Sequence, residues 1–181
     1  MINKKVNKYM GEDKINIGDK APLFKLDSYN AGLIDLAELL GNQKIVLIFS
    51  RYFGCPLCQL DLKKLMVRHS EIEEKGVKIL YITQSGEKVA SEFIEKESIK
   101  FPVIPSSKDE LYSEYGLGVM DSEAIKQVKV RFKESIKAGI KHGEYEGWEK
   151  QGPGQFIINE LGKITHAEKG WLDIDSLLAD L

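Results

Sequence analysis

The chain has 181 residues, of which 43% are hydrophobic, and its 26 basic and 28 acidic side chains give a formal net charge of −2. This balance provides no strong positive field for nucleic acid, and no stretch reaches the roughly 20 apolar residues that a membrane span needs. The length and the apolar content suit a single domain with a sizeable core.

The N-terminal segments predict a tail followed by a hairpin. Residues 1–14 are polar and basic and lack the apolar middle region of a signal peptide, so we expect a flexible tail there and one domain over residues 15–181. Turn residues between two short apolar pieces predict a hairpin within Lys20–Leu40, and a helical turn is expected from Asp35.

The next segment carries the only two cysteines of the chain. A buried strand is predicted at Ile45–Ser50, and Cys55 and Cys58 follow it at the start of a helix that runs to about Glu74. A thiol at a helix N-terminus meets free N–H groups and the positive end of the helix dipole, which favour the thiolate. The second sulfur lies one turn further, within reach of a disulfide. We therefore predict a redox site in which Cys55 has the lower pKa.

A metal site is the alternative for such a pair. A closed zinc site needs four ligands, and the three histidines, His69, His142 and His166, are scattered along the chain. Redox chemistry is therefore favoured, without metal, flavin or nucleotide. Two cysteines in a chain without an evident leader indicate a reducing compartment, and we expect a cytoplasmic location.

The rest of the chain alternates strands and helices. The predicted elements are, in order, a strand at Val77–Thr83, a helix at Gly86–Glu97, a peripheral strand at Phe101–Ile104, a short helix at Asp109–Tyr115, a long helix from Ser122 to about Lys141, a loop at Gly143–Gly154, strands at Gln155–Asn159 and Lys163–Glu168, and a helix at Ile174–Leu181. A βαβ half followed by a ββα half, with Cys-x-x-Cys after the first central strand, is the thioredoxin arrangement. The predicted fold class is therefore α/β, with a mixed central sheet flanked by helices, an N-terminal hairpin and an extra helix before the late strands.

The long helix is an insertion that a minimal thioredoxin fold does not need. Its apolar stripe is predicted to be buried, either on the domain or on the same helix of a second subunit in a homodimer. In either case we expect the helix to wall the pocket over Cys55. The stripe consists of Ile125, Val128, Phe132, Ile136 and Ile140.

Three segments in this order resemble one known family. Ile17–Leu26 resembles the opening of the alkyl hydroperoxide reductase/thiol-specific antioxidant superfamily, which contains the peroxiredoxins. Phe53–Cys58 is similar to its branch with Cys-x-x-Cys, and Gly152–Asn159 resembles its late strand. The resemblance extends from Ile15 to Leu181.

The resemblance implies a peroxide reductase. Cys55 would attack the peroxide O–O bond and become a sulfenic acid, and Cys58 would resolve it to a disulfide that an external dithiol such as thioredoxin reduces. The implied partners are a small peroxide or thiol and a dithiol reductant, with no nucleic acid and no membrane. Two alternatives keep the same residues: a reductase of protein or low-molecular-weight disulfides, and a redox sensor without catalysis.

Departures from the family pattern single out the supporting residues. Ile48 and Tyr52 stand where typical peroxiredoxins have a proline and a Thr or Ser before the reactive cysteine. Arg51 is the cation nearest to Cys55 in the sequence, and we expect it to hold the thiolate or to face solvent; Tyr52 is expected to donate its hydroxyl or to pack on the helix. Pro153 resembles the cis-proline of thioredoxin-like reductases, which predicts a cis Gly152–Pro153 bond beside the cysteines.

Overall fold

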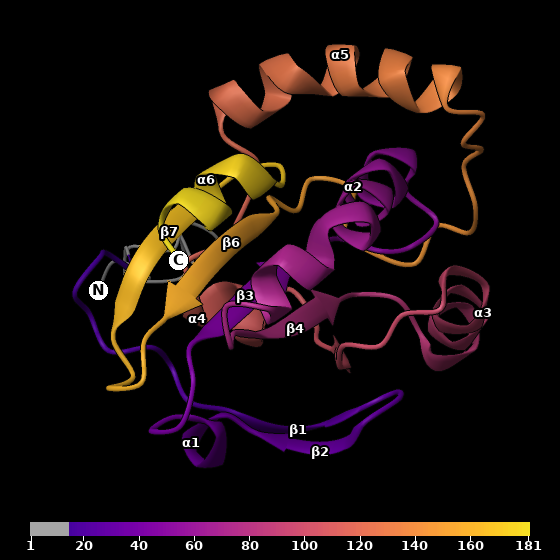
Figure 1. Cartoon of the computed structure of the whole chain (residues 1–181). Coiled ribbons are helices and arrows are strands. Elements are labelled where there is room, and N and C mark those ends of the chain that lie inside the picture. Colours follow the sequence, from indigo (N-terminus) through magenta and orange to yellow (C-terminus); the bar gives the residue numbers. More distant parts are fainter. Residues whose placement is uncertain (1–14) are drawn as a thin grey trace, which may run out of the picture.

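The computed structural model describes residues 15–181; the predicted tail over residues 1–14 lies outside the described residues. A five-stranded mixed sheet in the order β5-β4-β3-β6-β7 forms the centre (Figure 1). Its strands are β3 (Ile45–Phe49), β4 (Lys78–Thr83), β5 (Val103–Pro105), β6 (Gly154–Ile158) and β7 (Ile164–Lys169). β3, β4 and β5 are parallel, whereas β6 and β7 run antiparallel to their neighbours. This is the thioredoxin-like sheet that the sequence predicts.

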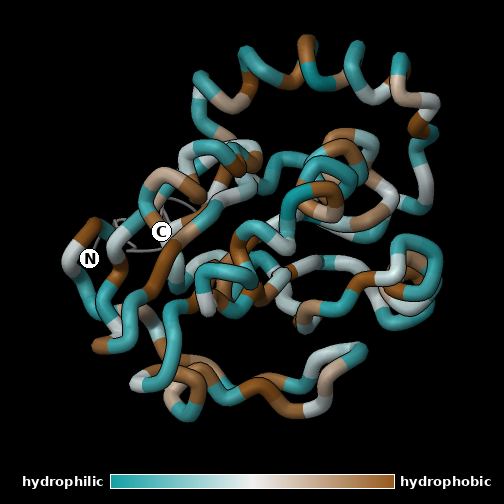
Figure 2. Tube along the Cα trace, in the orientation of Figure 1, coloured by the Kyte–Doolittle hydropathy of each residue, from teal (hydrophilic) through white to brown (hydrophobic). Residues whose placement is uncertain are grey.

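Helices cover both faces of the sheet. Successive side chains of β3 point to opposite faces, so each face needs a layer of helices to bury its apolar residues. Val46 and Ile48 face one core with α2, α3 and α6, whereas Leu47 and Phe49 face a second core with α1 and α4. The central strands β3, β4 and β6 are buried along nearly their whole length, and brown segments are visible in the sheet (Figure 2). The helices are α1 (Leu36–Leu39), α2 (Pro56–Glu73), α3 (Glu87–Glu97), α4 (Leu111–Glu114), α5 (Ser122–Lys137) and α6 (Ile174–Ala179), and the hairpin is β1 (Lys25–Ser28) with β2 (Gly32–Asp35).

The cysteine helix begins and ends as the sequence predicts. Cys55 is the N-cap of α2, and its Sγ accepts a hydrogen bond from the backbone N–H of Cys58 at 3.4 Å. Pro56 occupies the first turn, where its missing N–H costs nothing. The chain leaves the helix at Gly76, whose φ of +76° favours glycine. The sequence thus places the first sulfur at the N-cap of α2 and the second one turn inside the helix.

The long helix differs from its prediction in length and in burial. α5 ends at Lys137 rather than near Lys141, because Gly139 adopts a φ of +69°. The expected burial of the stripe is wrong for three of its members: Ile125, Phe132 and Ile136 are 55%, 47% and 58% exposed. α5 lies across α2 as the outermost layer on that side (Figure 1) and buries mainly the small side chains Ala124 and Ser135, so Ile125, Phe132 and Ile136 stay at the surface. Within residues 15–181, no helix combines the length and the apolar character that crossing a membrane requires.

Candidate active site

Both cysteine sulfurs lie buried at the head of α2. Cys55 is 1% and Cys58 2% exposed, and the two are free thiols. They share a small apolar cluster with Tyr52, Ala124 and Trp171. Substrate therefore reaches the sulfurs only when something above them moves.

Arg51, at the end of β3, lies directly on the first sulfur. Its Nη2 donates to Cys55 Sγ at 2.7 Å, and its Nη1 donates to the Glu149 carbonyl at 2.6 Å. The side chain is 6% exposed, and its guanidinium lies 5.3 Å from the centre of the Trp171 ring. Of the two orientations expected from the sequence, the structure has the buried one, in which the guanidinium contacts the Cys55 sulfur instead of facing solvent.

The contact between the two sulfurs and the nearby Arg51 cation move the two thiol pKa values in opposite directions. Burial would raise the pKa of Cys58, but the hydrogen bond with Cys55 and the Arg51 cation lower it to about 5. The same hydrogen bond, followed by burial and the charge of Cys58, raises the pKa of Cys55 well above its ordinary value. The sequence predicted the lower pKa for Cys55, and the structure gives it to Cys58. The prediction considered only the N-cap position of Cys55 and not the contact between the two sulfurs.

A loop over residues 138–153, here called the lid loop, covers the site. The Gly143 N–H donates to the Gly54 carbonyl at 2.8 Å, and the Tyr52 hydroxyl donates to the Glu149 carboxylate. Tyr52 Oη also lies 3.3 Å from His142 Nε2. Tyr52 therefore both packs in the apolar cluster and holds the lid loop through its hydroxyl.

Glycine before the first cysteine is explained by the close approach of this loop. A Cβ on Gly54 would lie 2.0 Å from the Glu144 carbonyl oxygen, far inside the distance at which non-bonded carbon and oxygen atoms repel. Gln84, at the end of β4, accepts a hydrogen bond from the Trp148 N–H at 2.7 Å and fastens the other side of the loop. Sequence reasoning missed His142, Gln84 and Glu149 as lid contacts.

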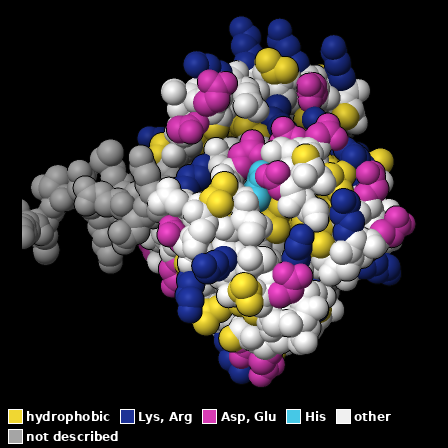
Figure 3. Space-filling model, turned by 60° about the vertical axis from the view of Figure 1, so that its left-hand side comes forward, with side chains coloured by type: hydrophobic (Ala, Val, Ile, Leu, Met, Phe, Trp, Pro, Cys, Tyr) yellow, Lys and Arg dark blue, Asp and Glu magenta, His cyan; other side chains and the backbone are white. Residues whose placement is uncertain are grey.

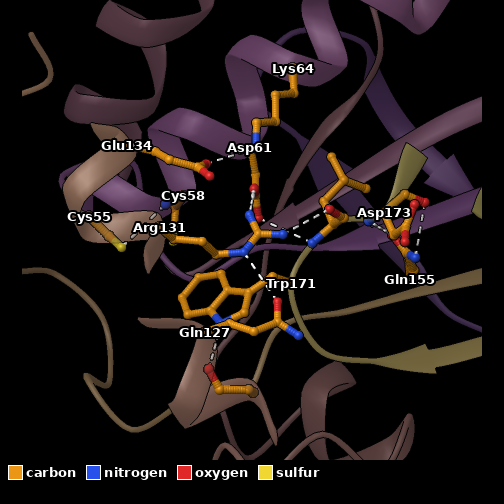
Figure 4. A network of polar contacts seen from close by, with 12 residues as sticks. Cys55, Cys58, Asp61, Lys64, Gln127, Arg131, Glu134, Gln155, Trp171 and Asp173 are labelled. Atoms are coloured by element: carbon orange, nitrogen blue, oxygen red, sulfur yellow. Dashed lines mark hydrogen bonds and ion pairs between the residues drawn. The ribbon is translucent and has the colours of Figure 1, made fainter. Parts of the chain in front are cut away.

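A buried ion pair on the far side of Cys58 was also missed. Asp61, one turn after Cys58, binds Arg131 of α5 through its carboxylate and accepts the Leu172 N–H at 3.2 Å (Figure 4). Burial raises the pKa of Asp61 to about 7, against the opposing effect of Arg131. The Trp171 Nε1–H donates to the Ala124 carbonyl at 2.9 Å, which also fastens α5 over the site.

Cys58 and Asp61 both line a cavity of about 10 Å³, close to the space of one water. Pro153 and Trp171 also line it, so the structure does place Pro153 beside the second sulfur. The predicted cis bond is wrong, however, because every peptide bond in the described residues is trans. The resemblance to the reductases holds for the position of Pro153 and fails for its geometry.

Breaking the Asp61–Arg131 pair should destabilise the fold and loosen α5. We expect Asp61→Asn to lower the free energy of unfolding by about 3–5 kcal/mol, because it leaves the buried Arg131 cation uncompensated. Asp61→Asn with Arg131→Met should recover most of the loss. Chemical denaturation of both variants measures this, with Asp175→Asn as control, since Asp175 pairs with Arg68 while being 88% exposed. A double variant as unstable as the single one would contradict the role of the pair.

Comparison with known proteins agrees with this geometry. The family model described as the AhpC/TSA family matches residues 17–167. The thiol-disulfide oxidoreductase ResA of Oceanobacillus iheyensis is 24% identical over 149 residues, covering 79% of this chain and 77% of that protein. A protein of Coxiella burnetii assigned as the peroxiredoxin bcp is 26% identical over 105 residues, covering 58% of this chain and 69% of that protein.

The fold is also found among solved structures. The reduced 2-Cys peroxiredoxin of Plasmodium vivax superposes with a TM-score of 0.65 at 14% identity, covering 90% of this chain and 92% of that one. At this identity the likeness concerns the fold alone. It agrees with the mixed sheet and helix layers described above.

Proposed function

The chain belongs to the AhpC/TSA family and is a thiol-dependent oxidoreductase, and on this premise we propose that it reduces small peroxides through Cys55 and Cys58. The observation that carries the proposal is the Arg51 guanidinium, 2.7 Å from Cys55 Sγ in a closed site. A cation on the sulfur stabilises the attacking thiolate, and its remaining N–H groups can hold a peroxide oxygen. A closed site of this size favours a small oxidant over an extended protein chain.

The proposed cycle starts with one negative charge shared by the two sulfurs. The Cys55 proton passes to Cys58 along their hydrogen bond, and the Cys55 thiolate attacks the O–O bond. Cys55 becomes a sulfenic acid, and the leaving alkoxide takes the proton of Cys58. The Cys58 thiolate then attacks the Cys55 sulfur, and hydroxide leaves as water after taking one proton from the medium. The sum is one peroxide and one proton consumed, with an alcohol, a water and the Cys55–Cys58 disulfide formed.

Asp61 is suited to the proton transfers of this cycle. With a pKa of about 7 it exchanges a proton near neutral pH, and it lines the same small cavity as Cys58. An external dithiol then attacks the disulfide and returns both cysteines to the reduced state. We propose a thioredoxin-like dithiol protein as this reductant.

Reduction of disulfides is the second candidate. It is supported by the proximity of Cys58, Asp61 and Pro153, because dithiol exchange needs a proton acceptor beside the second sulfur. The ResA relative, whose name describes this reaction, points the same way. Stopped-flow oxidation of the reduced protein by hydrogen peroxide, compared with its reduction of insulin disulfides, separates the two. We expect peroxide to react faster; insulin reduction at the rate of a thioredoxin, with slow peroxide oxidation, would favour the second candidate.

Opening of the lid loop should limit access to the sulfurs. Gly54→Ala introduces a methyl group where the Glu144 carbonyl lies, so the loop must move away, and we expect iodoacetamide to alkylate the cysteines at least about tenfold faster. Gly86→Ala is the matched control, because its methyl group meets the lid loop only at the movable end of the Glu146 side chain, at 3.3 Å, and not at the loop backbone. Equal alkylation rates in Gly54→Ala and the native chain would show that the loop does not restrict entry.

A further inference from the structure

The outward face of α5 is an apolar strip without a partner in the described chain. Ile125, Phe132 and Ile136 recur at spacings of seven and four residues, which places them on one side of a helix of about 3.6 residues per turn. All three are about half exposed or more. An amphipathic helix normally turns such residues toward the core, and α5 instead turns Ala124 and Ser135 inward.

A strip of lysines runs beside this apolar strip along the whole helix. Lys126, Lys129, Lys133 and Lys137 are exposed and follow one another every three or four residues. Of these, only Lys126 has an ion pair among the described residues, with Glu123. Figure 3 shows dark blue side chains standing along the top of the molecule over α5, with yellow ones among them. The helix is thus locally basic in a chain whose net charge is −2.

The acidic residues of α5 do not neutralise this face. Glu123 lies on the flank and pairs with Lys126, and Glu134 lies on the same flank and pairs with Lys64 of α2. Together, the exposed apolar and basic strips form a surface of one sign of charge, here called the α5 face. It is defined by Ile125, Lys126, Lys129, Phe132, Lys133, Ile136 and Lys137.

The composition of the α5 face distinguishes between its candidate occupants. A second copy of the chain would bring two rows of lysines together, which is repulsive. A specific protein pocket usually recognises Arg, Trp or Tyr anchors, and the arginine of α5, Arg131, instead points inward to Asp61. Evenly repeated lysines beside aliphatic and Phe side chains are typical of helices that lie on anionic lipid.

We propose that the α5 face docks on the surface of an anionic lipid bilayer. Ile125, Phe132 and Ile136 would enter the boundary between headgroups and acyl chains, while the lysines contact the lipid phosphates. Within the described residues, α5 lies at the periphery on the side of the sheet that α2 covers (Figure 1), so its outer side is open to a flat surface. This peripheral contact needs no membrane-spanning helix, and it revises the expectation of no membrane partner, which followed from the lack of an apolar stretch long enough to span a bilayer.

Flotation of the native chain with vesicles tests the proposal. We expect the protein to float with vesicles of equal parts phosphatidylglycerol and phosphatidylcholine at low salt, and to remain free with phosphatidylcholine alone. Lys129→Gln, Lys133→Gln and Lys137→Gln together should weaken partitioning on the order of a hundredfold, at about fivefold for each lysine. Phe132→Ser should weaken it about fivefold to tenfold. All four side chains are exposed, so the variants should keep the fold.

Matched variants elsewhere on the surface provide the controls. Lys75→Gln, Lys88→Gln and Lys100→Gln change the net charge equally on exposed lysines outside α5, and Leu161→Ser removes an apolar side chain that is 78% exposed in a turn. These variants should float like the native chain. The proposal is overturned if the chain binds neutral and anionic vesicles equally, or if the control lysine variants weaken flotation as much as those of α5. It is also overturned if the native chain binds no vesicle and is a dimer that Phe132→Ser converts to a monomer.

Discussion

Cys55→Ser should abolish peroxide turnover, with a loss of at least about 10³-fold. Serine has no sulfur to form the attacking thiolate beside the Arg51 guanidinium or to carry the oxygen atom. Cys58→Ser should also stop steady turnover, since the disulfide cannot form. It should nevertheless leave Cys55 able to react once with peroxide.

Mass spectrometry of the two variants after one equivalent of peroxide measures this difference. Cys58→Ser should gain one oxygen atom at Cys55, which a dimedone-type reagent traps as the sulfenic acid. Cys55→Ser should stay unmodified on the same time scale. Oxidation of Cys58 in Cys55→Ser, with an inert Cys55 in the other variant, would assign the attack to the second sulfur, whose pKa is lowered to about 5.

Arg51→Met should raise the pH at which the thiol pair ionises and slow peroxide oxidation. In the native chain Arg51 helps to lower the pKa of Cys58 to about 5, so the thiolate persists at neutral pH and is lost as the pH falls through about 5. Removing the cation should move this midpoint upward by about 1–3 pH units. We expect oxidation at pH 7 to slow at least about tenfold, because less thiolate is present and the sulfur loses its donor.

Thiolate absorbance at 240 nm against pH, together with peroxide rates, measures both effects. Arg51→Lys keeps the charge but cannot bind Cys55 Sγ and the Glu149 carbonyl together, so it should shift the midpoint less. Arg68→Met is the matched control, because this arginine of α2 is partly exposed and pairs with Glu71 and Asp175. A thiol ionisation midpoint that stays near pH 5 in Arg51→Met would show that Arg51 does not stabilise the thiolate.

Local patterns were sufficient for most of the fold. The apolar run Ile45–Ser50 and the helical spacing after Cys55 depend on residues close in sequence, and the structure has β3 and α2 at those places. The two cysteines and Arg51 were found for the same reason, because they lie within one strand–helix junction. Periodicity and capping rules describe residues that are close in the sequence, so they predict features of this kind.

The covering of the site depends on contacts between distant segments. Tyr52 meets Glu149 and Asp61 meets Arg131 across 97 and 70 residues, and no periodic pattern connects such pairs. The burial of the α5 stripe was mispredicted because the prediction assumed that the apolar face of a helix turns toward the core. α5 is instead held on the domain by the Arg131–Asp61 ion pair and by the small residues Ala124 and Ser135. The order of the thiol pKa values likewise depends on the contact between Cys55, Cys58 and Arg51, which only the folded chain brings together.

The most direct test of the central claim is a titration of the reduced protein with hydrogen peroxide, followed by counting free thiols and weighing the intact chain. We predict that one equivalent of peroxide removes both thiols and lowers the mass by two hydrogen atoms, because Cys55 and Cys58 form an intramolecular disulfide. A dithiol reductant should then restore both thiols. Two thiols that persist through several equivalents of peroxide, in a chain that retains its fold, would contradict the proposed peroxide reduction.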